Sequence, residues 1–129
     1  MSQRIWKPVL GYPGYVVSNL GEIANAKTKR GLEGSWINGY RRVTIQHKGK
    51  PVNINPARAV LEAFYGPAPL GKEVDHKNTN RWDNRLENLW WRTHQENMNN
   101  SITREKMRKP HKIGKYYDDI PEGIWKWDD

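Results

Sequence analysis

The stretch VDHKNTNRWDNRLENLWWRTHQEN, residues 74–97, decides how this chain folds. A short β-prone run, 73–76, leads into an Asn-rich polar segment, and a second β-prone run follows at 89–92. Thr93 and Glu96 have the spacing of a capping box, which predicts that a helix begins there. The stretch therefore predicts a strand, a polar loop, a second strand and a helix, a unit too short to have much core of its own.

The same unit concentrates Asp, His and Asn. Asp75 and His76 are neighbours on a strand, so their side chains point to opposite faces unless the strand ends and twists there. Asn97 lies one turn into the helix, where its amide oxygen can face the same cavity as the Asp75 carboxylate. Two hard oxygen ligands, with the other positions left to water and phosphate oxygens, are typical of a Mg²⁺ site used for phosphoryl chemistry. His76, with an ordinary pKa of about 6.5, can take a proton from an attacking water.

The competing interpretation is a surface Asp-His pair in a turn, followed by an Asn-rich loop that caps itself through Asx turns. Asn88, Asn97 and the capping box argue against it for Asp75 and His76, whereas most of the other loop Asn residues fit it. Of the two Trp residues in the second strand, Trp91 is in phase with Leu89 and is expected in the core, with Trp90 half exposed.

Residues 74–97 resemble the HNH nuclease family, in particular the phage-type homing endonucleases, whose motif reads Asp-His, a mid-motif Asn and a helical Asn. Upstream, WKPV at 6–9 and GYVVSNLGEI at 14–23 resemble the nuclease-associated modular DNA-binding segment that often precedes this core. The resemblance covers roughly residues 5–101. It implies an α+β fold in which a small N-terminal β-hairpin unit is followed by a ββα-metal (HNH) nuclease core.

The resemblance also implies a function, the hydrolysis of a DNA phosphodiester with one Mg²⁺ or Mn²⁺ per active site. Carried over by motif position, the implied roles are Asp75 as first metal ligand, His76 as general base, Asn88 as the structural Asn that ties the ββ loop and orients the base, and Asn97 as second metal ligand. Asn84 and His94 are the nearest competitors for the Asn88 and helical-ligand roles, although they lie off the family spacing. Family members often carry a His where this chain has Pro56-Ala57-Arg58.

The elements between the two matching segments are a hairpin and a helix. Tyr40–His47 alternates, with Val43 and Ile45 toward the core and Arg42, Thr44 and Gln46 outward. Asn55 as N-cap, Pro56 as first helical residue and Gly66 as stop predict a helix over 56–65. We expect an N-terminal DNA-binding β unit at 1–55, the nuclease core with its preceding helix at 56–109, and an acidic aromatic tail at 110–129.

Charge points to a polyanionic partner. The 129 residues carry a net charge of +8, and residues 1–109 hold 19 of the 22 Lys and Arg but 9 of the 14 Asp and Glu, a net charge of +10. Double-stranded DNA is the leading partner, although a basic solvated surface without such a partner has the same composition. The expected DNA contacts are Lys27, Lys29, Arg30, Arg42, Arg81, Arg85 and Arg92.

The sequence has no cysteine and no long apolar run, and these two features exclude several kinds of site and protein. Without cysteine there is no disulfide, thiolate zinc site or cysteine nucleophile, and no apolar run is long enough to span a membrane. We expect a cytoplasmic protein, in the host cell if phage-encoded, acting as a monomer or a DNA-assembled dimer. Many relatives add a helical DNA-reading module where this chain has an aromatic tail, expected to pack on the body, so we expect loose sequence preference and mainly nicking.

Two other functions remain open from the sequence. One is a DNA-binding accessory or regulatory protein that keeps the HNH fold without cleavage, and the other is a protein-binding module whose basic face docks an acidic partner. A metal-dependent cleavage assay on plasmid DNA separates cleavage from binding.

Overall fold

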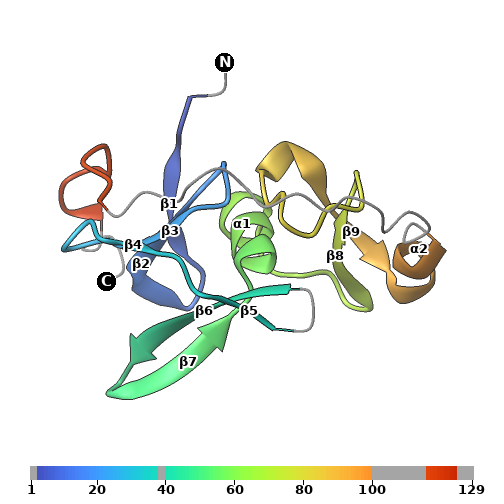
Figure 1. The fold of residues 1–129 in the computed structure, drawn as a ribbon, viewed down its shortest axis with the longest axis horizontal. Helices are drawn as coiled ribbons and strands as arrows, with labels where there is room; N and C mark the ends of the chain where they lie inside the picture. Colours follow the sequence, from blue (N-terminus) through green and yellow to red (C-terminus); the bar gives the residue numbers. More distant parts are fainter. Residues whose placement is uncertain (1–2, 38–39, 100–115, 125–129) are drawn as a thin grey trace.

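The computed structural model describes residues 3–37, 40–99 and 116–124 of the chain. In these ranges, three small antiparallel sheets lie around the helix α1 (Figure 1). This mixture of hairpins and helices confirms the expected α+β class.

The first sheet is built from the N-terminal residues, with strands in the order β1-β2-β3-β4. Its strands are β1 (Trp6–Val9), β2 (Tyr12–Ser18), β3 (Ile23–Asn25) and β4 (Gly31–Leu32). Both Val16 and Val17 of β2 are fully buried, and because strand side chains alternate, they pack into two different hydrophobic clusters. Both faces of this sheet are therefore covered.

The second sheet has the order β5-β6-β7 and contains the hairpin expected from the alternation. Its strands are β5 (Ser35–Ile37), β6 (Tyr40–His47) and β7 (Lys50–Ile54). Val43 and Ile45 are buried, and Thr44 and Gln46 are exposed, as predicted. Arg42, expected on the outward row, is only partly exposed, and its Nη1 donates to the carbonyl oxygen of Arg41 at 3.1 Å.

Helix α1 (Pro56–Tyr65) has the bounds that the capping residues predict. The Asn55 side chain accepts a hydrogen bond from the backbone N–H of Ala57 at 3.0 Å, and Gly66 ends the helix with φ 97°. Val60 and Leu61 are fully buried between the first sheet and the third. The helix therefore joins the N-terminal sheets to the hairpin that follows.

The third sheet is the hairpin of β8 (Lys72–His76) and β9 (Leu89–Thr93), followed by α2 (His94–Asn99). A short 3-10 turn, η1 (Leu86–Asn88), precedes β9. The capping box is confirmed, because Thr93 Oγ1 accepts from the Glu96 N–H at 3.1 Å and Glu96 Oε1 accepts from the Thr93 N–H at 2.9 Å. Met98 of α2 is exposed.

The main core is continuous across the three sheets. Val17 of β2, Val43 and Ile45 of β6, Leu61 of α1 and Leu89 of β9 belong to one buried cluster. Trp91 packs against this cluster, whereas Trp90 is 39% exposed, which confirms the expected orientation of the two rings. The hairpin is thus fixed against the N-terminal half by shared apolar burial.

A second cluster holds part of the tail. Tyr117, Ile120 and Ile124 are buried against Trp6 and Val16, so residues 116–124 of the tail pack on the body as expected, and the other tail residues lie outside the described ranges. The Trp6 indole N–H donates to Asp119 at 3.0 Å. Among the described residues, no helix is both long and apolar enough to cross a lipid bilayer.

Candidate active site

The hairpin β8–β9 puts the two central residues of the motif on opposite sides. Asp75 lies across from Trp90, and His76 lies across from Leu89. Both Asp75 and His76 are buried, at 4% and 7% exposure, in the last two positions of β8. The alternation of a β-strand therefore gives the carboxylate and the imidazole separate surroundings.

The His76 ring is held by a residue of the polar loop. His76 Nε2 lies 2.8 Å from Asn84 Oδ1, and both side chains are buried. Because an amide oxygen can only accept, this contact requires the ring proton on Nε2. Burial lowers the pKa of His76, and its effect exceeds the opposing effects of the Asn84 hydrogen bond and the Asp75 charge. The ring is therefore neutral at neutral pH.

Asn88 closes the loop between the two strands. Its Oδ1 accepts from the backbone N–H of Asn78 at 3.1 Å, and its Nδ2 donates to Asn78 Oδ1 and to the carbonyl oxygen of Asp83, both at 2.9 Å. Its carbonyl oxygen accepts from the Lys77 N–H at 2.8 Å. Asn88 thus ties the ββ loop, as expected. A hydrogen bond to the His76 ring comes from Asn84; that Asn88 orients the base stays a prediction.

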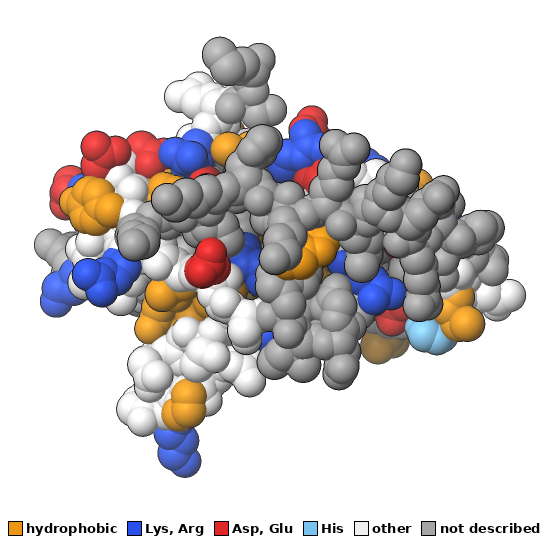
Figure 2. All heavy atoms as spheres, viewed as in Figure 1, with side chains coloured by type: hydrophobic (Ala, Val, Ile, Leu, Met, Phe, Trp, Pro, Cys, Tyr) orange, Lys and Arg blue, Asp and Glu red, His pale blue; other side chains and the backbone are white. Residues whose placement is uncertain are grey.

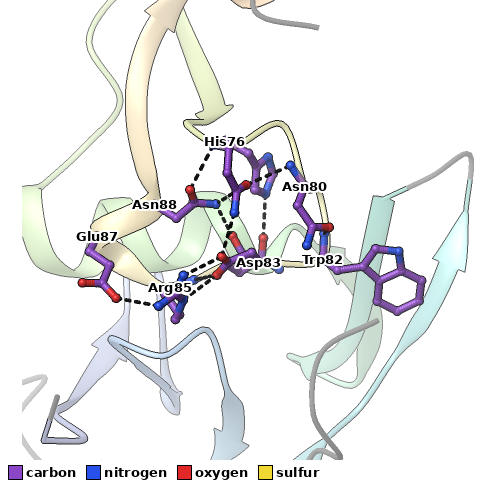
Figure 3. Close-up of polar contacts among 9 residues, drawn as sticks. His76, Asn80, Trp82, Asp83, Arg85, Glu87 and Asn88 are labelled. Atoms are coloured by element: carbon purple, nitrogen blue, oxygen red, sulfur yellow. Dashed lines mark hydrogen bonds and ion pairs between the residues drawn. The ribbon is translucent and has the colours of Figure 1, made fainter. Parts of the chain in front are cut away.

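Figure 3 shows the polar side chains of this loop turned toward one another, with the Trp82 indole pointing away from them. Arg85 donates to both carboxylate oxygens of Asp83 at 2.7 Å and to Glu87 at 2.7 Å. Burial raises the pKa of Asp83, but the hydrogen bonds and charge of Arg85 outweigh it, so the pKa lies below its ordinary value. Arg85, expected at DNA, thus makes ion pairs within its own loop.

Asp75 is held on the other side of the hairpin by an aromatic residue. Trp90 Nε1 donates to Asp75 Oδ2 at 2.9 Å. Two cations lie over the Trp90 ring, with the Arg92 guanidinium 4.2 Å and the Lys77 ammonium 5.1 Å from its centroid. Arg92 Nε also lies 3.6 Å from Glu96 Oε1. Lys77 and Arg92 thus help to hold the Trp90 indole, which donates the hydrogen bond to the Asp75 carboxylate.

Asn97 reaches β8 from α2. Its Nδ2 donates to Glu73 Oε1 at 2.7 Å and to the carbonyl oxygen of Val74, next to Asp75 in the chain, at 3.2 Å. With the amide nitrogen turned to the strand, Oδ1 is the atom suited to a cation. His94, the competitor for this role, contacts the same Glu73 at 3.1 Å.

The donor set fits a hard divalent cation better than a soft one. A buried carboxylate and an amide oxygen leave most of the coordination sphere to water and phosphate, which suits Mg²⁺ or Mn²⁺. The described residues contain no group of three or more His, Cys, Asp or Glu that could hold a metal. A site made from Asp75 and Asn97 therefore depends on solvent and substrate oxygens to complete it.

The basic residues expected at DNA lie in separate places. Residues 27–30 join β3 to β4 at one end of the molecule, beside residues 116–124, whereas β8, β9 and α2 lie at the other end (Figure 1). Lys29 is ion-paired with Glu122 at 2.6 Å. Figure 2 shows acidic side chains gathered at the end of the molecule that holds the 116–124 segment. Lys27 and Arg30 are exposed, and Arg81 is partly exposed near His76.

Two residues with direct contacts to the motif carried no assigned role in the sequence. Asn84 was only a competitor for the Asn88 position, and Trp90 was only a half-exposed ring. Register offers a signal for Trp90, since a hairpin closed by residues 77–88 brings it across from Asp75. No comparable signal marks Asn84, because its position depends on the loop's internal folding.

Family models match the chain in two places. An HNH endonuclease model matches residues 58–99, and a NUMOD4 motif matches residues 5–46. Among solved structures, the chain is similar to one titled "DNA binding and cleavage by the HNH homing endonuclease I-HmuI", with a TM-score of 0.68 and 31% identity. The likeness covers 76% of this chain and 57% of that one.

Several curated proteins are similar to the chain. DNA endonuclease I-HmuI of Bacillus phage SP01 is 35% identical over 101 residues, 77% of this chain and 58% of that protein. The uncharacterized HNH endonuclease L245 of Acanthamoeba polyphaga mimivirus is 30% identical, covering 76% of this chain and 30% of that protein. H-N-H endonuclease F-TflII of Escherichia phage T5 is 34% identical, and the match covers 74% of this chain and 51% of that protein. The chain thus spans less than two thirds of the length of each of these relatives.

Proposed function

Because the chain belongs to the phage-type HNH homing endonucleases, with a NUMOD4 motif at 5–46 and an HNH endonuclease domain at 58–99, we propose that it is a metal-dependent DNA endonuclease. The observation that carries the proposal is the pair of buried residues at the end of β8. Asp75 accepts a hydrogen bond from Trp90 and His76 contacts Asn84, on opposite sides of the hairpin. Buried polar side chains need hydrogen-bond partners in any role, so the weight of this observation comes from the pair being the Asp and His of the HNH motif, fixed at the end of β8.

His76 is the proposed general base. In the neutral ring with Nε2 protonated, the lone pair is on Nδ1, which accepts a proton from the attacking water as the water oxygen bonds to phosphorus. The bond from phosphorus to the 3′ oxygen then breaks, leaving a 5′ phosphate and a 3′ alcohol after protonation. Burial, which lowers the pKa of His76, keeps the ring ready to accept this proton.

Asp75 and Asn97 are the proposed ligands of one Mg²⁺ or Mn²⁺ per site. A bound divalent cation would supply positive charge to stabilise the phosphorane and the leaving oxygen. The chain's own contribution is to fix the two ligand oxygens: Trp90 holds Asp75, and Asn97 is anchored on Glu73 and Val74. Held ligands lose less conformational freedom when the cation binds.

Cleavage of supercoiled plasmid tests the proposal. We expect nicked DNA with Mg²⁺ or Mn²⁺ and none in excess EDTA, because the ligand pair has only oxygen donors. Equal cleavage in EDTA would contradict the metal's role. Binding without cleavage under all divalent ions would favour the non-cleaving DNA-binding protein instead.

Double-stranded DNA is the proposed partner, in the host cytoplasm where such DNA is found. The excess positive charge of residues 1–109 supports phosphate contacts from Lys27, Lys29, Arg30, Arg42, Arg81, Arg85 and Arg92. If about six phosphates are neutralised, the logarithm of the binding constant falls with the logarithm of salt at a slope of about −5. Titration at three salt concentrations measures the slope, and a flat response would favour an acidic protein partner.

Nicking is the proposed mode of cleavage. One His76 and one pair of ligands, Asp75 and Asn97, process one phosphodiester at a time. A double-strand break then needs a second event or a dimer assembled on DNA. In a time course, open circular DNA should precede linear DNA; direct conversion to linear DNA below any measurable self-association would contradict this mode.

A further inference from the structure

Asn84 lies between the His76 ring and a turn of the N-terminal unit. Its side-chain oxygen is 2.8 Å from His76 Nε2, while its backbone and Cβ face Gly21. A Cβ built on Gly21 would lie 2.8 Å from Asn84 Cβ and 2.9 Å from its carbonyl oxygen. Two residues further on, the Leu86 N–H donates to the carbonyl oxygen of Asn19 at 2.8 Å. The turn of residues 18–21 is therefore in direct contact with the segment that positions Asn84.

This turn is held from within and by the residues that precede β1. The hydroxyl of the buried Ser18 accepts from the backbone N–H groups of Leu20 and Glu22, at 3.1 and 3.2 Å. It also donates to the Glu22 carboxylate at 2.8 Å, which in turn accepts from Arg4 at 2.6 Å. The Asn19 side chain accepts from the Ile5 N–H at 2.7 Å. These contacts leave the turn little freedom to move away from Asn84.

Arg41 also contacts the turn of residues 18–21, through the carbonyl oxygen of Gly21. It is 6% exposed, and its guanidinium donates to the carbonyl oxygens of Gly21, Leu32 and Glu33 at 3.0, 2.7 and 2.7 Å. A buried guanidinium that gives its hydrogen bonds to backbone carbonyls fixes the loops that carry them. Arg41, the turn, Asn84 and His76 thus form a continuous series of contacts.

We propose that Asn84 is a positioning residue that keeps the His76 ring proton on Nε2, and that the turn of residues 18–21 in the N-terminal unit holds Asn84 in place for this purpose. The proposal rests on the proposed function, since it gives the base of that reaction its orientation. On this proposal the N-terminal unit, besides its proposed binding of DNA, also helps to set the geometry of the active site.

The chemistry of a neutral imidazole makes this support consequential. One ring nitrogen carries the proton and the other the lone pair, and the partner of the first selects which nitrogen can act as base. The Asn84 oxygen selects Nε2–H, so Nδ1 is the basic nitrogen. Without this acceptor, the hydrogen bond that favours Nε2–H is lost, and a smaller part of the population presents the Nδ1 lone pair in the productive orientation.

Variants at Asn84 test the first half of the proposal in the full-length chain. Asn84→Ala removes the acceptor, whereas Asn84→Asp keeps an oxygen at the same place. In ¹⁵N-edited spectra of the metal-free protein at pH 8, with His76 assigned by comparison with His76→Gln, we expect Nε2–H in the native chain and in Asn84→Asp. Asn84→Ala should show tautomer exchange and a kcat lowered by about 10- to 100-fold at saturating DNA, with KM little changed. An unchanged tautomer and unchanged kcat in Asn84→Ala would overturn the proposal.

A matched pair of glycines tests the second half. Gly21 and Gly11 have φ of 89° and 85°, so an alanine costs similar backbone strain at either, but Gly11 has no atom within 4 Å of a built Cβ. We expect Gly21→Ala to displace Asn84, alter the His76 ring signals and lower kcat, with DNA binding retained. Gly11→Ala should keep the native ring signals and kcat. Equal behaviour of the two folded variants would overturn the role of the turn.

The tautomer readout separates this proposal from the proposed function. If the native chain shows Nε2–H on His76 and loses it in Asn84→Ala while His76→Ala cleaves DNA normally, the positioning is real and the function assigned to His76 is wrong. If His76→Ala is inactive but the His76 ring of the native chain carries its proton on Nδ1, the proposed function holds and the positioning proposal fails.

Discussion

The two sides of the β8–β9 hairpin support their key residues by different means. Asp75 is held by Trp90, its cross-strand neighbour, so its support comes from the hairpin itself. His76 is held by Asn84, whose own place is set by the turn at Gly21, over 60 residues earlier in the chain. The comparison indicates that the proposed cation ligand Asp75 has local support, whereas the proposed base depends on docking of the N-terminal unit.

The largest expected effect is on the side of the base. His76→Ala should lower the cleavage rate by about 10²-fold or more, because it removes the proposed acceptor of the attacking water's proton. DNA affinity, measured by fluorescence anisotropy in Ca²⁺, should stay nearly unchanged. Cleavage at the native rate would remove His76 from the mechanism.

On the side of the ligands, Trp90→Phe should weaken activation by Mg²⁺ about 10-fold, because the ring remains but the hydrogen bond to Asp75 is lost. Titration of Mg²⁺ against cleavage rate gives the apparent affinity. Trp82→Phe is the matched control, since its indole points away from the loop's polar cluster (Figure 3). An equal shift in both variants would mean that the indole N–H has no special role.

The contribution of Asn88 to the loop between β8 and β9 can be measured as a change in the free energy of unfolding. Asn88→Ala removes two donated bonds and one accepted bond in a buried position, and should lower the free energy of unfolding by about 2–3 kcal/mol. Denaturant unfolding measures the change. Asn80→Ala, in the same loop but less buried, is the comparison, and a loss as large at Asn80 would contradict the special position of Asn88.

The smallest expected effect concerns acid stability of that loop. The folded-state pKa of Asp83 lies below its ordinary value, so the unfolded chain takes up this proton first as pH falls. The stabilisation by Arg85 is thus present above about pH 4 and is lost as the pH falls through the folded-state pKa. Arg85→Ala should cost less than about 1 kcal/mol at pH 6, and the difference from the native chain should shrink in acid. A difference that grows toward pH 3 would contradict the ion pair's role.

Local sequence rules predicted much of the fold. Helix α1 begins after Asn55 and ends at Gly66, and the capping box at Thr93 starts α2, because each of these signals acts within one turn of helix. The alternation in β6 predicted which residues are buried, since the period of a strand is set by its backbone. The tail's aromatic content predicted its packing as far as residue 124.

The partners of the motif residues were less predictable. The sequence pointed to Asn88 both for tying the loop and for orienting the base; in the structure Asn88 ties the loop, and Asn84 makes the hydrogen bond to the His76 ring. The two side chains differ by only four positions, and the Asn-rich loop offers several amides with the same chemistry. Spacing along the chain cannot distinguish them, because the loop's direction is set by hydrogen bonds that close across it.

By itself, the sequence predicted the strand, loop, strand and helix that follow from residue 73, because hydrophobic phase and helix caps act over a few residues. Its resemblance to the HNH nucleases singled out Asp75, His76, Asn88 and Asn97 as the proposed site. Only the tertiary structure decided that Asn84 holds the imidazole and that Gly21 leaves room for Asn84. Those contacts join segments far apart in the chain, and they form only when the apolar residues of the N-terminal sheets, α1 and β9 are buried in one core.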